Sequence, residues 1–282
     1  MAILVDYNNV ITAGILATYH EVGGGEISEP FVRHMAMMFF QTYRKKYPKH
    51  GEIILCCDGP NSWRKEHYPY YKANRVRDKD VDDSGFDWKE FYRVLNLVRE
   101  EMKTRMPYKV IHIDRVEGDD GMGVLARNLK GPHTVVSNDK DMGQLTRYEG
   151  VTIYSPLKGI EVKINDPERY LREHIIYGDK GDFVPNILSD DDVFVNPDKR
   201  QKSIFKKKLD GYMEGELTDH FPEENVKRNV LMIDLEQIPQ EYCDKIMASY
   251  EEQKEKKVTR SQIYDYFVEK RLAKLLEDIQ NF

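Results

Sequence analysis

The sequence predicts an α/β protein: a central, mostly parallel β-sheet flanked by helices, followed by a smaller, mainly helical C-terminal lobe. Two observations lead to this class. Short apolar runs alternate with helix-length segments in the first part of the chain, which is typical of a parallel sheet covered on both faces. After about Lys163 the strand pattern fades and the remainder has a helical pattern. We therefore expect an α/β core at residues 1–165 and a helical lobe at residues 166–282.

Five apolar runs are expected to form the strands, and two long segments the first helices. The runs are AILVDY, EIILCCD, YKVIHID, HTVVSND and VTIYSP. The segment SEPFVRHMAMMFFQTYRKKY begins with Ser28 as an N-cap and has Pro30 in its first turn, as helices often do. A second helix is predicted by apolar residues three and four apart, namely Trp88, Phe91, Leu95, Val98 and Met102.

Composition narrows the class of protein. The chain has 282 residues, of which 40% are hydrophobic and 33% charged, and its net charge is −6. No apolar run approaches the roughly 20 residues that a membrane span needs, and MAILVDYNNV has no basic signal-peptide segment. Cys56 and Cys57 are neighbours in an apolar run and Cys243 is distant, which favours a reduced protein over a disulfide framework. We expect a cytoplasmic protein without a membrane partner.

Carboxylates follow most of the predicted strands. They are Asp6 after the first run, Asp58 after the second, Glu117, Asp119 and Asp120 after the third, and Asp139 and Asp141 after the fourth. The carboxyl ends of parallel strands lie along one edge of a sheet, so these side chains should meet there. Asp179 and Asp182, in YGDKGD, add a further pair.

Such a cluster needs compensation, because like charges in one site raise each other's pKa. A single Asp after a strand is usually a turn former or a helix N-cap. A cap needs one acid, however, and not three in four residues as in Glu117–Asp120. Divalent cations with oxygen ligands, Mg²⁺ first, are the expected partners. A His/Cys metal site is not expected, since the histidines are scattered without ligand spacing.

Basic residues suggest the substrate. The segment WRKEHYPYYKANRVR interleaves cations with aromatic rings: Arg64, Lys65, Lys72, Arg75 and Arg77 with Trp63, Tyr68, Tyr70 and Tyr71. Cations contact phosphates and rings stack on bases, although these tyrosines could instead pack inward. A second run, DKRQKSIFKKK, contains Lys206 and Lys207 and either follows a duplex backbone or is an exposed helix surface. Metal ions beside a phosphate-binding segment suggest phosphodiester hydrolysis.

Six motifs resemble, in order, those of the 5′-nuclease (flap endonuclease) superfamily, most closely its branch of ribonucleases H, 5′→3′ exonucleases of T-even-type bacteriophages. They are ILVDYNNV, CCDGPNSWRKEHYPYYKANR, RVEGDDGMGVL, VVSNDKDMGQL, IYSPLKG and IIYGDKGD, and the similarity continues in NVLMIDLEQIP and SQIYDYFVEKRLAKL. The resemblance implies a PIN-like core and a nuclease that acts at the 5′ ends, flaps or forks of DNA and RNA–DNA duplexes. It also implies two Mg²⁺ ions, with Mn²⁺ as a substitute, and removal of lagging-strand primers.

The resemblance also implies residue roles. The first metal site would use Asp6, Asp58, Glu117, Asp119 and Asp139, and the second Asp141, Asp179 and Asp182 with Asp120 nearby. Lys72 and Arg75 match catalytic cations at the scissile phosphate, and Tyr71 a residue that packs on the end nucleotide. We count Asp139 and Asp141 with the catalytic residues as well.

Two segments are compared with DNA-binding elements of the family. The stretch near residues 75–88 matches its arch or bridge, but the acidic DKDVDD is not expected to form a stable helix without substrate. A helix-hairpin-helix-like region is expected within the lobe at residues 166–282, around GDKGDFVPNILSDDDVF. Phe183 stands where the family usually has Asn, and no glycines follow, so no monovalent ion is expected there.

Other functions remain open. One is a haloacid-dehalogenase-type phosphatase, but position 8 is Asn where that class needs a second Asp. Another is a non-catalytic DNA-end-binding replication protein, which the full carboxylate set and Lys72 disfavour. We expect a monomer, located in the host cytoplasm if phage-encoded. The C-terminal stretch SQIYDYFVEKRLAKLLEDIQNF, with its stripe Val268, Leu272, Leu275 and Ile279, should pack on the core; the alternative is docking to a single-stranded DNA-binding protein.

Overall fold

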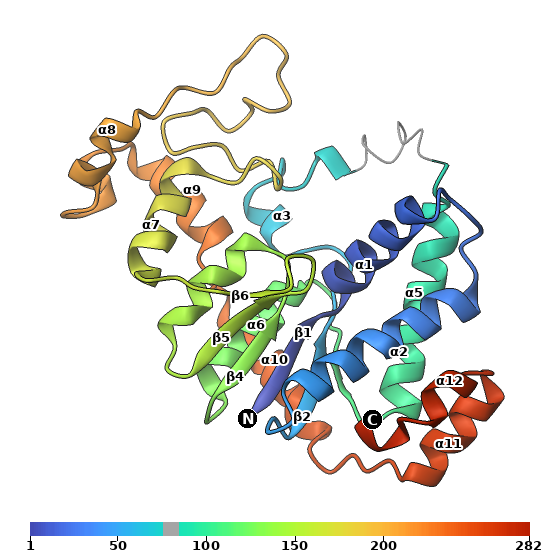
Figure 1. Cartoon of the computed structure of the whole chain (residues 1–282). Helices are drawn as coiled ribbons and strands as arrows, with labels where there is room; N and C mark the ends of the chain where they lie inside the picture. The colour runs from blue at the N-terminus through green and yellow to red at the C-terminus, as the bar shows by residue number, and fades with distance from the viewer. Residues whose placement is uncertain (76–84) are drawn as a thin grey trace.

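A computed structural model of the chain describes residues 1–75 and 85–282 (Figure 1). Residues 76–84, with Arg77 and most of the expected arch, lie outside the described part. The main elements are, in chain order, β1 Ala2–Asp6, α1 Tyr7–Glu21, α2 Glu29–Lys46, β2 Glu52–Cys56, α3 Arg64–His67, α5 Trp88–Arg105, β3 Lys109–Ile111, α6 Gly118–Asn128, β4 His133–Val136, η1 Lys140–Arg147, β5 Val151–Ser155, β6 Ile160–Val162, α7 Pro167–Tyr177, α8 Lys206–Leu209, α9 Glu223–Ile233, α10 Gln240–Glu252, α11 Arg260–Glu269 and α12 Ala273–Leu276. Short 3₁₀ turns follow at η2 Asp210–Tyr212, η3 Leu217–Asp219 and η4 Ile279–Asn281.

The sheet confirms the predicted fold class. Its strand order is β3-β2-β1-β4-β5-β6, and the pairings from β3 to β5 are all parallel. All five predicted runs contain strands. The sixth strand, β6, pairs antiparallel with β5 at the edge and was not predicted. Its residues are mostly exposed, so its sequence has no apolar run that could have indicated it.

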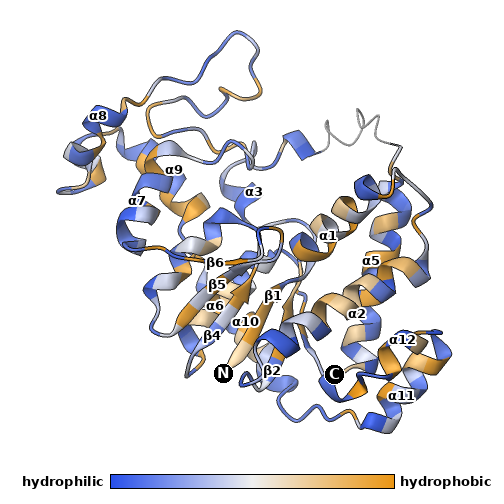
Figure 2. Cartoon of the chain, in the orientation of Figure 1, coloured by the Kyte–Doolittle hydropathy of each residue, from blue (hydrophilic) through white to orange (hydrophobic). Residues whose placement is uncertain are grey.

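The central strand β1 contributes side chains to two separate hydrophobic cores, one on each face of the sheet. Ile3 and Val5 pack with α1, α2 and α5 on one face, and Ala2 and Leu4 pack with α6 and α10 on the other. This division follows from the alternation of side chains along a strand. Figure 2 shows the strands in the hydrophobic colour at the centre of the molecule and hydrophilic colour over outer parts such as α8. Helices α2 and α5 begin at the predicted places, after Ser28 and at Trp88.

The chain from α7 onward forms a third core. This core gathers Leu171 and Ile175 of α7 with Val226 and Met232 of α9. Residues 178–205, all described, consist of turns and irregular segments without a helix. Pro185 lacks the N–H that a helix would use, and acidic residues such as those at 190–192 favour turns.

The C-terminal helices return to the sheet layers. Helix α10 packs against α6 and β3, and α11 packs against α5. Ile263, Tyr266 and Phe267 of α11 are buried in the same core as Ile3 and Val5. None of the described helices combines the length and the apolar character that crossing a membrane would need.

Candidate active site

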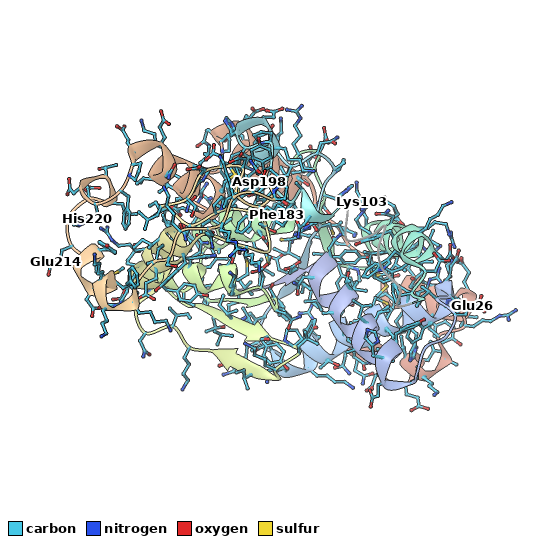
Figure 3. The ribbon with its side chains drawn as sticks, turned by 90° about the horizontal axis from the view of Figure 1, so that it is seen from above. Glu26, Lys103, Phe183, Asp198, Glu214 and His220 are labelled. Carbon is cyan, nitrogen blue, oxygen red and sulfur yellow. The ribbon has the colours of Figure 1, made fainter. Side chains whose placement is uncertain are left out.

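The predicted acidic edge exists, and parallel topology creates it. Asp6 ends β1 and caps α1, Asp58 follows β2, and Asp139 follows β4 and caps η1. Glu117 caps α6, which begins after β3. All strands of the parallel part end at the upper edge of the sheet in Figure 1, and Figure 3 looks down onto that edge. In that view Phe183 lies over the middle of the molecule and His220 near its outer end.

A cavity of about 330 Å³ opens at this edge. Four of its lining residues are carboxylates, Asp6, Asp58, Asp119 and Asp139, and two are cations, Lys72 and Arg75. The structure therefore brings together five segments that are distant in sequence. A larger cavity of about 960 Å³ adjoins it, because Asp58 and Arg75 line both, and Trp88 and Tyr92 belong to its wall.

Polar neighbours fix the orientation of the carboxylates. Ser137 donates its Oγ–H to Asp6 Oδ2 at 2.7 Å, and the Gly118 N–H donates to Asp58 Oδ1 at 2.9 Å. The Asp141 N–H donates to Asp139 Oδ1 at 2.9 Å. Each of these bonds engages one carboxylate oxygen, and among the described residues the second oxygen of Asp58 and of Asp139 accepts no hydrogen bond.

The carboxylates at the edge repel each other. Burial, with the charges of Asp58 and Asp139, raises the pKa of Asp6 to about 7. Burial and the charges of Asp139 and Asp6 likewise raise the pKa of Asp119 well above its usual range. Divalent cations would relieve this repulsion, and carboxylate oxygens are the ligands that Mg²⁺ and Mn²⁺ take. The donor set thus fits divalent metal ions.

Lys72 reaches the site through an unusual backbone conformation. Its φ is 55°, in the left-handed region, and its N–H donates to the Asp182 carbonyl at 2.9 Å. Its Nζ donates to Glu117 Oε1 and lies 3.4 Å from Asp182 Oδ2. Burial alone would raise the pKa of Glu117, but the charges of Lys72 and Arg64 outweigh it and hold that pKa below its usual range.

Arg75 is the more exposed of the two cations: 55% of its side chain is exposed, against 10% for Lys72. Its Nη2 donates to Asp182 Oδ1 at 3.1 Å. The Tyr71 hydroxyl lies 3.1 Å from Asp182 Oδ2 and 3.0 Å from Glu117 Oε2, so its one hydrogen is shared between two carboxylates. Asp182 therefore connects both cations of the cavity with the segment that follows α7.

A second, more compact group lies beside the cavity. Donor atoms of Asp141, His174 and Asp179 all lie within 4.8 Å of one another. Burial, followed by the charges of Asp139 and Asp179, raises the pKa of Asp141 well above its usual range. Asp179 Oδ1 accepts the N–H groups of Gly181 and Asp182 at 2.7 and 3.2 Å. His174 was not among the predicted site residues; its position directly before the motif IIYGDKGD was the available signal.

Two predicted site residues are placed elsewhere. Asp120 is fully buried, and its carboxylate accepts from Arg64 Nη2 at 2.8 Å, Trp63 Nε1 at 3.1 Å and the Glu117 N–H at 3.0 Å. Arg64 is 3% exposed and also binds Glu117. Asp120 thus has its charge compensated by a protein cation, and Arg64 is not accessible to a phosphate. In this structure both residues pair with protein groups, whereas the sequence analysis expected a metal ligand at Asp120 and a phosphate contact at Arg64.

The remaining predicted contacts differ in exposure. Tyr71 is 4% exposed and packs in the third core with Tyr68, so these rings face inward, which was the alternative considered for this segment. Lys65 is exposed on α3. Lys206 and Lys207 are exposed on α8, at the outer end of the molecule beyond α7 and α9 (Figure 1).

Comparisons with known proteins identify the family of the chain. Residues 3–175 match the family of the 5′-3′ exonuclease N-terminal resolvase-like domain, and residues 166–282 match the C-terminal region of T4 RNase H. The ribonuclease H of Enterobacteria phage T4 is 28% identical over 295 residues, which cover 99% of this chain and 95% of that protein. A 5′-3′ exonuclease of Streptomyces coelicolor is 27% identical over 156 residues, 50% of this chain and 51% of that protein.

Solved structures show the same fold. The D15 protein of bacteriophage T5, crystallised with metal ions, has a TM-score of 0.64 at 20% identity over 90% of this chain and 99% of its own. A T5 D15 flap endonuclease complex with DNA and metal ions has a TM-score of 0.66 at 21% identity, covering 88% and 93% of the two chains. Because one family model alone matches more than half of the sequence, the chain belongs to the 5′-3′ exonuclease family and is a nuclease, a phosphodiester hydrolase.

Proposed function

We propose that this protein is a divalent-metal-dependent 5′→3′ exonuclease and flap endonuclease that cleaves at the 5′ ends of RNA–DNA and DNA duplexes. The observation that carries the proposal is the single cavity in which four carboxylates face Lys72 and Arg75. Carboxylates suit metal ions and the two cations suit phosphate, so one cavity combines both requirements for phosphodiester hydrolysis.

The carboxylates would hold two Mg²⁺ ions, or Mn²⁺ in their place. Asp6, Asp58, Asp119 and Asp139, with Glu117 beside them, are the proposed residues of the first site. Asp141, Asp179 and Asp182 are those of the second. When bound, such a pair of ions supplies an activated water and stabilises the leaving oxygen.

Lys72 and Arg75 would bind the scissile phosphate. Both are now paired with Asp182, so an incoming phosphate would compete with that carboxylate for the same cations. Arg75, which is half exposed, needs only to rotate its side chain, and its guanidinium can hold two phosphate oxygens. Lys72, held by Glu117, is positioned to stabilise charge that develops on the phosphate.

Further cations would bind the rest of the nucleic acid. The proposed phosphate contacts are Lys65, Lys206 and Lys207, which are exposed, and Arg77, which lies outside the described residues. Lys206 and Lys207 lie on α8, at the outer end of the molecule in Figure 1, where a duplex arm could reach them. The T5 D15 flap endonuclease was crystallised with DNA, which supports a DNA substrate here. We propose a monomer that removes primers during lagging-strand replication, in the host cytoplasm if phage-encoded.

The competing functions are less well supported. Asn8, where a haloacid-dehalogenase-type phosphatase needs an acid, accepts the Asp58 N–H through its Oδ1 at 3.1 Å and acts as a structural amide. A non-catalytic DNA-end-binding protein would not need four mutually repelling carboxylates, which disfavour the folded state unless ions bind.

The decisive experiment is digestion of 5′-labelled primer–template, RNA-primed and flap substrates with Mg²⁺, Mn²⁺ or excess EDTA. Release of short 5′ products with either metal and none with EDTA is the expected result. Hydrolysis of p-nitrophenyl phosphate without cleavage of DNA or RNA would support the phosphatase. Binding of the flap substrate without any cleavage in either metal would support the end-binding protein.

A further inference from the structure

The compact group beside the cavity contains a largely buried imidazole whose Nε2 lies between two carboxylates. His174 Nε2 lies 3.5 Å from Asp141 Oδ1 and 3.4 Å from Asp179 Oδ2. The His174 side chain is only 9% exposed. Within the described chain, neither His174 Nε2 nor Asp141 Oδ1 has a hydrogen-bond partner. Two buried polar atoms from different elements, α7 and η1, are thus directed at one point without satisfying each other.

The spacing of these atoms resembles that of ligands around one ion. Neighbouring ligands of a six-coordinate ion with bonds of about 2.1–2.2 Å are about 3 Å apart, and opposite ligands about 4.3 Å. The three donor atoms here lie within 4.8 Å of one another, with two of the separations at 3.4 and 3.5 Å. A convergence of a few tenths of an ångström would therefore place all three around a single cation.

Two features hold the group in place. The Gly178 N–H donates to the His174 carbonyl at 2.9 Å where α7 ends. This bond fixes the path of the backbone between His174 and Asp179. Asp179 Oδ1 is occupied by two backbone N–H groups, so its Oδ2 is the oxygen that faces His174.

The neighbouring lysine is a weaker candidate for a permanent partner of Asp179. Lys140 Nζ lies 3.1 Å from Asp179 Oδ2, but its side chain is 59% exposed. The Lys140 side chain can rotate into solvent when an ion binds, whereas the imidazole of His174 is enclosed by protein and stays in place.

We propose that His174 Nε2 is a direct ligand of the ion held by Asp141 and Asp179, and that this site consequently prefers Mn²⁺ to Mg²⁺. The inference rests on the proposed metal-dependent function and adds a nitrogen donor to a site otherwise made of oxygen. Imidazole is a good ligand for first-row transition metals, while Mg²⁺ prefers oxygen and water. The first site, with carboxylates only, lacks that preference.

The alternative role of His174 is that of a counter-charge. A protonated imidazole would neutralise Asp141 and Asp179 without binding metal, and a lysine would then do equally well. His174→Lys keeps a cation at the position and removes the neutral nitrogen donor, whereas His174→Gln removes both. His220, which is exposed and lies near the outer end of the molecule in Figure 3, provides the control variant His220→Gln.

The experiment uses the full chain loaded with Mn²⁺ and no substrate. Electron spin echo envelope modulation detects a ¹⁴N coupling when an imidazole nitrogen is bound to Mn²⁺, and the signal of free Mn²⁺ reports affinity. We expect a nitrogen coupling in the wild type and in His220→Gln. In His174→Gln and His174→Lys it should be lost, with one of two Mn²⁺ ions bound about 10–100-fold more weakly. Mg²⁺ should displace the nitrogen-coupled ion less readily than the other.

Each contrary result has a distinct meaning. Two bound Mn²⁺ ions without nitrogen coupling in the wild type, or wild-type affinity in His174→Lys, would overturn the ligand role and leave the proposed nuclease intact. A wild type that binds no Mn²⁺ at millimolar concentration would overturn both. The wild-type spectrum decides the question even if a His174 variant does not fold.

Discussion

Lys72 and Glu117 form an ion pair in which a lysine with left-handed backbone meets the glutamate that caps α6. A left-handed conformation costs a non-glycine residue about 1–2 kcal/mol. The ion pair, and the bond from the Lys72 N–H to the Asp182 carbonyl, oppose that cost. Lys72 thereby joins the basic segment to two acidic segments that lie far along the chain.

This pairing predicts different effects of removing the two cations. Lys72→Ala should slow the chemical step at least 100-fold with little change in substrate affinity, because the ammonium acts on developing charge. It should also cost about 1–3 kcal/mol of stability, since the buried Glu117 loses a partner. Single-turnover rates, binding titrations and urea unfolding measure the three quantities.

Arg75 provides the comparison. Arg75→Ala should also slow the chemical step but leave the free energy of unfolding nearly unchanged, because its side chain is 55% exposed. Arg75→Lys should restore the rate only in part, since an ammonium lacks the two-pronged geometry of a guanidinium. A loss confined to binding in both alanine variants would make these residues phosphate anchors and not catalytic groups.

The carboxylates at the end of β4 are expected to be essential for cleavage. Asp139→Asn or Asp141→Asn should abolish cleavage while DNA binding stays largely intact, since each removes a proposed ligand charge. Without metal the melting temperature should stay level or rise, because the charge of Asp139 contributes to the raised pKa values of Asp6, Asp119 and Asp141. Full activity in Asp139→Asn would remove Asp139 from the proposed ligand set.

The raised pKa of Asp6 leads us to predict that the stability of the metal-free protein depends on pH. Its pKa rises from 3.8 to about 7 on folding, chiefly through burial. The carboxyl of Asp6 holds its proton more tightly in the folded state than in the unfolded state. Its contribution to the free energy of unfolding is therefore complete below about pH 4 and is lost as the pH rises through about 7. Relative to Asp6→Asn, the wild type should lose roughly 2–3 kcal/mol of stability between pH 5 and pH 8.

The comparison with Asp6→Asn cancels the opposite trend of the histidines, such as His133, whose pKa burial lowers. Denaturant unfolding in EDTA gives the two curves, and saturating Mn²⁺ should remove the difference in slope. Parallel curves in EDTA would show that the proton on Asp6 is not linked to folding.

Gly178 and Gly159 both have a positive φ, so alanine substitutions at the two positions separate the cost of backbone strain from that of a steric clash. Gly178 has φ 69° and Gly159 has φ 67°, so alanine costs about 1 kcal/mol at either from conformation alone. A Cβ at Gly178 would also lie 2.4 Å from the Pro185 carbonyl oxygen, whereas Gly159 has open space. Gly178→Ala should therefore be much the more destabilising and should weaken Mn²⁺ binding, because it displaces Asp179. Equal unfolding free energies for the two variants would contradict this.

The C-terminal helix is expected to be a packing element. Phe267 is fully buried and Val268 is 52% exposed. Phe267→Ala should cost about 3–5 kcal/mol and Val268→Ala less than about 0.5 kcal/mol. Deleting residues 261–282 should give an insoluble or thermally weakened protein. A soluble truncation with an unchanged melting temperature that no longer responds to a single-stranded DNA-binding protein would instead establish docking.

The apolar stripe predicted for the C-terminal stretch was only partly confirmed. Leu272 and Leu275 are buried, but Val268 is exposed and Ile263, Tyr266 and Phe267 make the core contacts. The chain turns at Arg271, with φ 57°, so a single helical period does not continue from α11 into α12. A turn within a periodic segment is not visible in hydrophobic spacing.

The sequence alone determined the parallel sheet, its main helices and the edge at which the acidic residues meet. These features follow from periodicity between near neighbours and from the rule that parallel strands end at one edge. Only the tertiary structure decided how the charges there are paired. Arg64 neutralises Asp120, 56 residues away, while Lys72 is left at the cavity and His174 joins Asp141 and Asp179. Residue type does not distinguish these outcomes, because the partner of a buried charge depends on which distant side chain packing brings within a few ångströms.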